Sequence, residues 1–301
     1  MSPHHHHHGH RSTDSATDSG TGTDIDWNEL LPLLERGAEL QTPLYRRVTA
    51  WLGELVPAAG VRRVLDVGSG PGVLSCLLAE AFPYAEVVAV DSTPELLERA
   101  RDRAASLGLA RVTTRHAELP ADTADLGRAD LIWAAGSLHH LGDQRAALAG
   151  LAGLLRPGGL LVLVEGGLQS RHLPQHTGVG RPGLEARIDA ANADWFAGMR
   201  AALPSAKEET DDWRALLTAA GLTPSGTRSF LHDVPAPVTD AVRDHVVSHF
   251  TWQRDSLGER LAADDRAALD RLLDPADPLS VHRRPDVFVL GARTVHTARR
   301  A

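Results

Sequence analysis

"VLDVGSGPG", at residues 64–72, joins a short apolar run to three glycines at alternate positions, Gly68, Gly70 and Gly72. Glycine adopts backbone conformations that other residues avoid, so glycines directly after an apolar run are typical of a buried strand that turns tightly into a helix. Such a loop lets a ligand approach the backbone closely at the start of the helix. The stretch therefore predicts a site for a nucleoside-containing cofactor and leaves open which one.

An alternation of strands and helices continues on both sides of this loop. Short apolar or β-branched runs predict strands, and the stretches between them carry apolar residues at helical spacing. The predicted strands lie at residues 62–67, 85–91, 110–116, 129–135, 159–165, 226–234 and 284–295. Strands buried between helices form a doubly wound, mostly parallel sheet. The predicted fold class is therefore α/β, with a Rossmann-like sheet of seven strands.

The rest of the chain divides into segments around this core. Asp26 and Thr42 stand where two N-terminal helices would be capped. The stretch after the fifth strand is too long for an ordinary connection, so we expect a helical lid or substrate-binding insertion there. The predicted segments are a disordered His-rich tail (1–25), an N-terminal helical cover (26–61), a cofactor-binding core (62–165), the insertion (166–208) and a C-terminal part of the core with helical elements on the substrate side (209–301).

Composition narrows the class of partner and the compartment. The net charge is -8 and no Lys/Arg cluster interleaves with aromatic residues, so we expect neither nucleic acid nor an anionic membrane surface as a partner. The single cysteine, Cys76, excludes an intramolecular disulfide and a Cys-rich zinc site, and we interpret it as a buried thiol. The chain has no 18-residue apolar run and no apolar signal segment, so we expect a cytoplasmic protein. The His run at residues 4–8 resembles a tag or a low-complexity tail, and no metal site is predicted.

Two residues at the glycine loop argue against a diphosphate ligand. A dinucleotide loop needs a third glycine where this chain has Val73, because that glycine lets the helix pack closely against the strand. The acid Asp66, at the tip of the strand, would repel a phosphate and attract a cation. S-adenosylmethionine has a sulfonium and no phosphate, so it suits this loop better than NAD does.

A second acid, Asp91, follows the next strand, 23 residues beyond Gly68. A carboxylate at this place accepts hydrogen bonds from the two hydroxyls of a ribose. Both NAD and S-adenosylmethionine carry that ribose, so Asp91 indicates a nucleoside without choosing between them.

Several motifs in order resemble the class I S-adenosylmethionine-dependent methyltransferases that act on small molecules. The motifs are "VLDVGSGPG" (64–72), "VVAVDSTPELLERA" (87–100), "RHAELP" (115–120), "ADLIWAAGSLHHL" (129–141) and "LLRPGGLLVLVE" (154–165). The resemblance is strong from residue 62 to residue 165 and holds only in outline elsewhere. It implies a last strand antiparallel to the others and S-adenosylmethionine as the cofactor.

The resemblance also implies a set of cofactor-binding residues. Near the methionine part of the cofactor it places Asp66, Gly68, Ser69, Gly70, Gly72 and the backbone carbonyl of Ala135. On the ribose and adenine it places Asp91, Ser92, Leu96, His116 and the backbone N–H of Ala117. His116 departs from the family pattern, which has an acid at that position to recognise the adenine amino group.

The acceptor side offers histidines as general bases. His139 and His140 follow the fourth strand, and an imidazole can take a proton from a hydroxyl as the methyl group arrives. The same turn lacks the Asn/Asp-Pro-Pro-aromatic signature of nucleobase and amide methyltransferases, and it lacks the acid that would hold magnesium in catechol-type enzymes. The two histidines are therefore the candidate catalytic residues, and bracing of the pocket is their alternative role.

Further histidines and aromatic residues could surround the acceptor. His172 and His176 lie at the start of the predicted insertion. His245 and His249 share one helical face, and we expect them to pack or face solvent rather than bind a metal. The aromatic candidates for pocket walls, for which core packing is the alternative, are Trp195, Phe196, Trp213, Phe250 and Trp252.

The sequence thus predicts a methyltransferase that uses S-adenosylmethionine and modifies a small organic molecule, with oxygen favoured over nitrogen or carbon as the acceptor atom. Two alternatives stay open. One is an NAD-dependent oxidoreductase, which Val73 and Asp66 disfavour. The other is a protein that binds S-adenosylmethionine without methylating anything.

Overall fold

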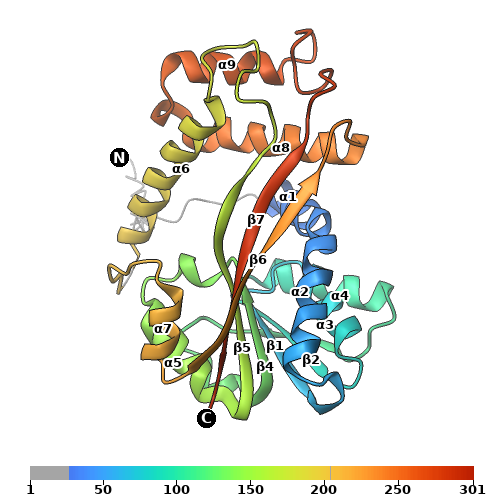
Figure 1. Ribbon diagram of the computed structural model, residues 1–301, viewed down its shortest axis with the longest axis vertical. Helices are drawn as coiled ribbons and strands as arrows, with labels where there is room; N and C mark the ends of the chain where they lie inside the picture. Colours follow the sequence, from blue (N-terminus) through green and yellow to red (C-terminus); the bar gives the residue numbers. More distant parts are fainter. Residues whose placement is uncertain (1–26, 204) are drawn as a thin grey trace, which may run out of the picture.

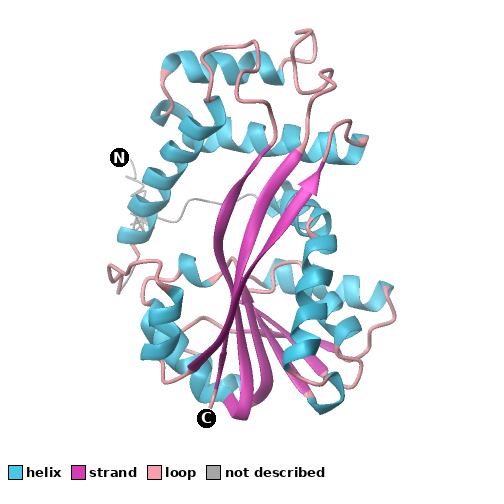
Figure 2. Cartoon of the chain, in the orientation of Figure 1, coloured by secondary structure: helices cyan, strands magenta, loops and turns pink. Residues whose placement is uncertain are grey.

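A computed structural model describes residues 27–203 and 205–301, and within them seven strands form one sheet (Figures 1 and 2). The strands are β1 (Arg63–Val67), β2 (Glu86–Asp91), β3 (Val112–His116), β4 (Ala129–Ala135), β5 (Leu155–Arg171), β6 (Thr223–Val234) and β7 (Val289–Arg299). Their order across the sheet is β3-β2-β1-β4-β5-β7-β6. The first five run parallel, and β7 lies antiparallel to both β5 and β6, so the predicted fold class is confirmed.

Helices connect and cover these strands. The α-helices are α1 (Trp27–Leu40), α2 (Thr42–Leu55), α3 (Val73–Ala81), α4 (Pro94–Ser106), α5 (Gln144–Leu154), α6 (Leu184–Ala201), α7 (Trp213–Ala219), α8 (Asp240–Leu257) and α9 (Ala263–Leu273). The 3-10 helices are η1 (Ala58–Gly60), η2 (Thr123–Leu126), η3 (Leu138–His140) and η4 (Gly258–Arg260). In the described part of the chain, no helix is both long enough and apolar enough to cross a membrane.

Two apolar clusters lie on opposite faces of the sheet because successive side chains of a strand alternate between its faces. One face of β1 and β4, with Val64 and Leu131, packs under α2 and α3. The other face, with Leu65 and Ile132, packs against α5 and α7. The central strands are buried on both faces, which explains their nearly continuous apolar sequence.

A third apolar cluster joins α6, α8 and α9 at the far end of the long strands. In Figure 1, β5, β7 and β6 extend beyond the shorter strands toward these helices. The predicted end of the fifth strand at residue 165 is wrong, because β5 continues to Arg171. It continues because β7 is long enough to pair with Gly167, Leu168 and Arg171.

The start of α2 differs from the prediction as well. Thr42 is the first residue of the helix and Gln41 precedes it as the capping residue, so the predicted cap at Thr42 is wrong. A single turn residue separates α1 from α2, and the Thr42 hydroxyl donates a hydrogen bond back to the carbonyl of Ala38 at 3.3 Å. Asp26 and the His-rich tail lie outside the described residues. The functional division of the chain into segments stays a prediction.

Candidate active site

The loop between β1 and α3 has three glycines in the left-handed backbone region, with φ angles of 69° at Gly68, 53° at Gly70 and 77° at Gly72. A Cβ atom at Gly68 would lie 2.3 Å from Cβ of Ser137, and one at Gly72 would lie 2.5 Å from Cβ of Ala100. A Cβ atom at Gly70 would meet nothing within 4 Å. Gly68 and Gly72 are therefore required by packing, whereas Gly70 faces open space where a ligand can approach the backbone.

Asp91, at the end of β2, is tied to the glycine loop. Its Oδ2 accepts a hydrogen bond of 2.9 Å from the backbone N–H of Gly70, and its Oδ1 accepts one of 3.0 Å from that of Thr93. These bonds connect the first and second motifs. Each carboxylate oxygen has a second lone pair, so the side chain can still accept hydrogen bonds from ribose hydroxyls.

Asp66 lies near the end of β1, just before the glycine loop. Its side chain points under α3, is almost fully buried and accepts a hydrogen bond of 2.5 Å from the hydroxyl of Ser75. The pKa of Asp66 is raised to about 7, mainly by burial; the hydrogen bond from Ser75 opposes the shift, and the nearby charge of Asp91 adds to it. The strand alternation turns Asp66 toward the helix. Asp66, like Asp91, is not among the residues that line the pocket, and its predicted contact with the cofactor stays a prediction.

The predicted adenine side has one conflict. The backbone N–H of Ala117 donates a hydrogen bond of 3.1 Å to the carbonyl of Asp91, so it is not available to a ligand as expected. This bond continues the parallel pairing of β2 with β3. A ring nitrogen of the exposed His116 lies 3.0 Å from the carbonyl oxygen of Ser92, and Leu96 is buried. The adenine contacts of His116, Ser92 and Leu96 stay predictions.

A pocket of about 1660 Å³ lies beside the glycine loop, between the carboxyl ends of the central strands, α1 and α6. It exceeds the roughly 300–1000 Å³ typical of a site for one small ligand, so it has room for part of a cofactor and an acceptor together. The predicted site residues that line it are Gly68, Ser69, Gly70, Ala135, His139 and His140. The predicted site residues that do not are Asp66, Gly72, Asp91, Ser92, Leu96, His116 and Ala117.

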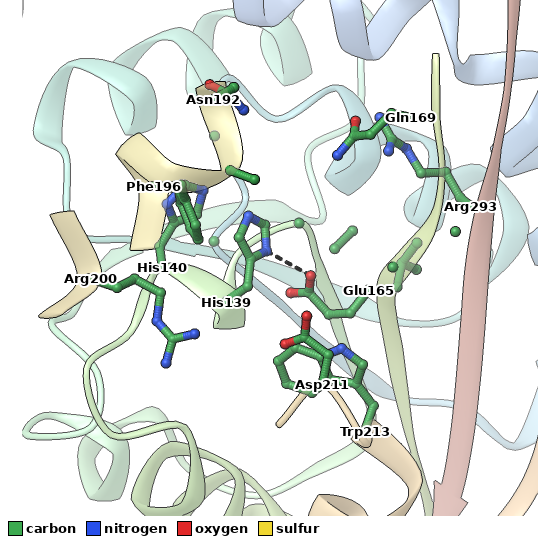
Figure 3. Close-up of a pocket in the computed structure, with 18 of the residues that line it drawn as sticks. His139, His140, Glu165, Gln169, Asn192, Phe196, Arg200, Asp211, Trp213 and Arg293 are labelled. Carbon is green, nitrogen blue, oxygen red and sulfur yellow. Dashed lines mark hydrogen bonds and ion pairs between the residues drawn. The ribbon is translucent and has the colours of Figure 1, made fainter. Parts of the chain in front are cut away.

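His139 forms a pair with Glu165 at the centre of this pocket (Figure 3). Nδ1 of His139 lies 2.7 Å from Oε2 of Glu165. The other carboxylate oxygen accepts hydrogen bonds from the backbone N–H groups of Ser137 at 3.1 Å and Leu138 at 2.9 Å. Glu165 is buried and held by three donors, so it fixes the orientation of the imidazole.

His140 has a different environment from its neighbour. Its ring centroid lies 4.2 Å from that of His139 and 5.2 Å from that of Phe196. The pKa of His140 is lowered to about 4, mainly by burial, with a smaller lowering from the positive charge of Arg200 and an opposing effect of Glu165. His140 is therefore neutral at physiological pH, and its surroundings suit packing against the pocket wall.

The other predicted histidines lie away from the pocket. His172 is buried, and its Nδ1 lies 3.0 Å from Oε1 of Glu185. Burial lowers the pKa of His245 to about 4 and that of His249 to about 3. These two histidines and His172 and His176 are absent from the pocket lining. Among the described residues, no group of three or more His, Cys, Asp or Glu side chains is placed to hold a metal ion.

Of the aromatic candidates, only Phe196 and Trp213 line the pocket. The rings of Trp195 and Trp252 pack against each other with centroids 6.1 Å apart, and Phe250 belongs to the third apolar cluster. Cys76 is buried, as predicted, and burial raises the pKa of its thiol to about 11.

The structure adds pocket residues that the sequence reasoning missed. They are Glu165, Gln169, Asn192, Arg200, Asp211 and Arg293 (Figure 3). Glu165 had the same signal as Asp66 and Asp91, since it is an acid at the end of a predicted strand. Arg200 and Arg293 stand in no recognisable motif, and only the packing of α6 and β7 brings them to the site.

Comparison with known proteins finds methyltransferases among the similar proteins. The methyltransferase domain family matches residues 64–159. An uncharacterized methyltransferase of Mycobacterium tuberculosis is 42% identical over 117 residues, which cover 38% of this chain and 55% of the relative. A trans-aconitate 2-methyltransferase of Methylobacterium radiotolerans is 38% identical over 138 residues, which cover 46% of this chain and 48% of the relative. The chain thus spans about half the length of the curated relatives that it matches.

Among solved structures, a putative methyltransferase from Bacillus halodurans superposes with a TM-score of 0.49 and 17% sequence identity, covering 83% of this chain and 97% of that chain. The domain match begins in the glycine loop's own strand and ends before β5 reaches the pocket. Residues 64–159 are therefore similar to a methyltransferase domain, and the curated relatives carry methyltransferase names as well.

Proposed function

We propose that the protein transfers a methyl group from S-adenosylmethionine to a small organic acceptor, with oxygen favoured as the acceptor atom. The observation that carries this proposal is the His139–Glu165 pair, which lies in the same pocket as the glycine loop. A positioned base is useful when the acceptor is a hydroxyl that must lose a proton. One relative is named for trans-aconitate, a small organic molecule, which supports a small-molecule acceptor here.

The residues around the loop fit the cofactor. The hydroxyl of Ser69 is buried in the pocket wall and has no hydrogen-bond partner among the described residues. A buried hydroxyl without a partner is costly, so its place is suited to a polar ligand. Together with the open space at Gly70 and the free lone pairs of Asp91, it supports the placement of the cofactor along the ends of β1 and β2.

When bound, S-adenosylmethionine supplies a methyl carbon bonded to a positively charged sulfur, and that bond breaks as the acceptor oxygen bonds to the carbon. The protein then has to align the acceptor, exclude water and receive a proton. α6 covers the pocket and α1 borders it, so these helices limit the access of water.

Glu165 sets the protonation pattern of His139. A carboxylate only accepts hydrogen bonds, so Nδ1 of His139 carries the hydrogen of this pair. The lone pair of the neutral imidazole is then on Nε2, where a hydroxyl proton can be received. The buried negative charge of Glu165 stabilises the imidazolium that forms.

Two experiments test the proposal. Calorimetry with S-adenosylmethionine, S-adenosylhomocysteine and NAD should show binding of the first two only. Release of S-adenosylhomocysteine should then be measured with a panel of phenols, carboxylates and amines, and we expect turnover with hydroxyl compounds. Binding of NAD without either adenosyl ligand would favour the oxidoreductase alternative. Tight cofactor binding with no release from any acceptor would favour the non-methylating alternative.

A further inference from the structure

Helix α6 turns three polar or aromatic side chains toward the pocket. Asn192, Phe196 and Arg200 are spaced four residues apart, so they lie along one face of the helix. Figure 3 shows them on one side of His139, with Glu165 on the other side. All three lie outside the domain match at residues 64–159, so they belong to the part of the chain that differs from the shared core.

Phe196 fixes this face over the candidate base. Its ring centroid lies 5.3 Å from that of His139 and 5.2 Å from that of His140. A helix rises about 1.5 Å per residue, so Asn192 and Arg200 are each displaced by about 6 Å along the helix axis from this contact. The face therefore offers a flat apolar centre with a polar group on either side.

Arg200 is a half-buried cation of this pocket. Its Nε is buried without a hydrogen-bond partner, and it forms no ion pair within residues 27–203 and 205–301. Its position in the last turn of α6 stabilises the helix dipole, but that interaction does not satisfy the donors of the guanidinium.

Lys207 and Arg293 differ from Arg200 in that a polar group of each already has a partner, an acid for Lys207 and a neutral amide for Arg293. Nζ of Lys207 lies 2.5 Å from Oδ2 of Asp143, and Nε of Arg293 donates a hydrogen bond of 3.0 Å to Oε1 of Gln41. Asp211 lines the pocket too, but it makes no ion pair with Arg200. Among these three cations, Arg200 is the one with a buried Nε that has no partner among the described residues. It also lies on the helix face of Phe196, so it is the best placed to bind an anionic ligand beside His139.

We propose that Arg200 binds a carboxylate of the methyl acceptor, and that the acceptor is a small planar hydroxy acid whose hydroxyl faces His139. A guanidinium matches a carboxylate with two parallel hydrogen bonds. The planar rings of Phe196, His139 and His140 suit a flat acceptor body between the two polar ends. This inference rests on the proposed methyl transfer, because it assigns the carboxylate as a handle and the hydroxyl as the acceptor.

The test is equilibrium binding to the protein saturated with S-adenosylhomocysteine, so that it does not depend on turnover. The probes are a panel of hydroxybenzoates and hydroxycinnamates, each compared with its primary amide. We expect the acids to bind about tenfold or more tightly than the amides, as for hydrogen bonds to a charged group. In Arg200→Met the preference should disappear, and in Arg200→Lys part of it should remain because the charge stays but the paired geometry is lost.

Arg293→Met is the matched comparison, since it removes the other pocket arginine, and it should keep the preference for acids. The affinity for S-adenosylhomocysteine should be the same in Arg200→Met as in the unsubstituted protein, and the thermal midpoint should fall by no more than the loss of one helix-dipole interaction, which separates ligand binding from a structural role at the helix end. Equal binding of acids and amides, or a preference that survives Arg200→Met, would overturn the proposal.

Turnover separates this inference from the proposed function. Formation of methyl ethers from hydroxy acids would support both the methyl transfer and the binding of the carboxylate by Arg200. Formation of methyl esters would show that the carboxylate reaches the methyl group, and it would overturn the assignment of the carboxylate to Arg200. Arg200-dependent binding of acids without any turnover would keep the carboxylate site and contradict only methyl transfer. Turnover of neutral acceptors without any preference for acids would keep methyl transfer and contradict only this inference.

Discussion

Glu165 and His139 are 26 residues apart in the sequence and form a close carboxylate–imidazole pair, with Oε2 and Nδ1 separated by 2.7 Å. Glu165 lies in β5 and His139 in η3, so the pairing depends on the register of the sheet and on the turn after β4. The side chain of Glu165 is 3% exposed and that of His139 is 32% exposed. The carboxylate is therefore shielded while the imidazole reaches the pocket.

The first prediction concerns Glu165→Gln. The amide oxygen can still accept from the N–H groups of Ser137 and Leu138, which turns the amide NH₂ toward Nδ1 of His139. The imidazole then carries its hydrogen on Nε2 and cannot receive a proton. We expect kcat to fall by about 10²-fold with little change in cofactor affinity, measured by S-adenosylhomocysteine release and calorimetry.

His139→Gln should reduce kcat to a similar level, and the double variant should be no slower than either single one. His140→Gln is the control, because the neutral His140 serves as packing and its replacement should change KM more than kcat. Full activity in Glu165→Gln would mean that no base is needed.

The second prediction contrasts two glycines of one loop. In Gly68→Ala the new Cβ would overlap Ser137, and we expect the free energy of unfolding to fall by about 3 kcal/mol or more. In Gly70→Ala nothing is within 4 Å, so only backbone strain of about 1–2 kcal/mol is expected. Gly70→Ala should nevertheless lose affinity for S-adenosylhomocysteine, because its Cβ enters the space of the ligand.

Urea unfolding and calorimetry distinguish these outcomes. Gly53→Ala, in the interior of α2 with nothing near its Cβ, is the control and should stabilise the protein by up to about 1 kcal/mol. Unchanged cofactor affinity in Gly70→Ala would place the ligand away from this loop.

The third prediction concerns Asp91→Ala. The side chain holds the N–H of Gly70 and offers lone pairs to a ribose, so its loss should weaken cofactor binding by about 1.5–3 kcal/mol. Asp91→Asn should lose less, because the amide oxygen still accepts. Glu86→Gln, at the opposite end of β2, is the control and should leave the affinity unchanged. An unchanged affinity in Asp91→Ala would show that the ribose is bound elsewhere.

The fourth prediction concerns the pKa of Asp66. Burial raises this pKa to about 7 from an ordinary value of about 3.9. Between these two pH values the folded protein binds a proton that the unfolded chain has lost, so the free energy of unfolding should fall as the pH rises. The total is on the order of 4 kcal/mol at most. Asp66→Asn should remove this part of the pH dependence and be the more stable form at pH 8.

Urea unfolding at pH 5, 6, 7 and 8 measures this effect as the difference between Asp66→Asn and the unsubstituted protein, so the contributions of other titrating groups cancel. The asparagine oxygen can still accept from Ser75, which keeps the local packing comparable. A difference that does not change with pH would show that Asp66 is ionised throughout the range.

The sequence predicted the sheet well because its signals are local. Apolar runs such as residues 85–91 have no alternative to burial, and the glycines at residues 68, 70 and 72 mark a turn that side chains would block. In a parallel sheet the carboxyl ends of neighbouring strands meet at one edge. Residues as far apart in the sequence as Gly70 and His139 were therefore expected at one site, and both line the same pocket.

The direction of a side chain and the existing partner of an N–H group are harder to predict from the sequence. Asp66 is expected near the ligand from its position in the sequence, and only the structure shows that the alternation along β1 turns its side chain under α3. The N–H of Ala117 was assigned to adenine, but the pairing of β2 with β3 already uses it. Neither outcome can be read from residue type and spacing, because both depend on which neighbours the backbone brings close.

By itself, then, the sequence determined the class of fold and the place of the glycine loop, since strand–helix alternation and turn residues act over a few positions. Only the tertiary structure decided that Glu165 orients His139 and that Arg200 faces the same pocket from α6. The physical reason is that these contacts join segments whose packing is set by apolar burial between helices and long strands. Such burial determines the distances between side chains of different segments, and it leaves no local motif in the sequence.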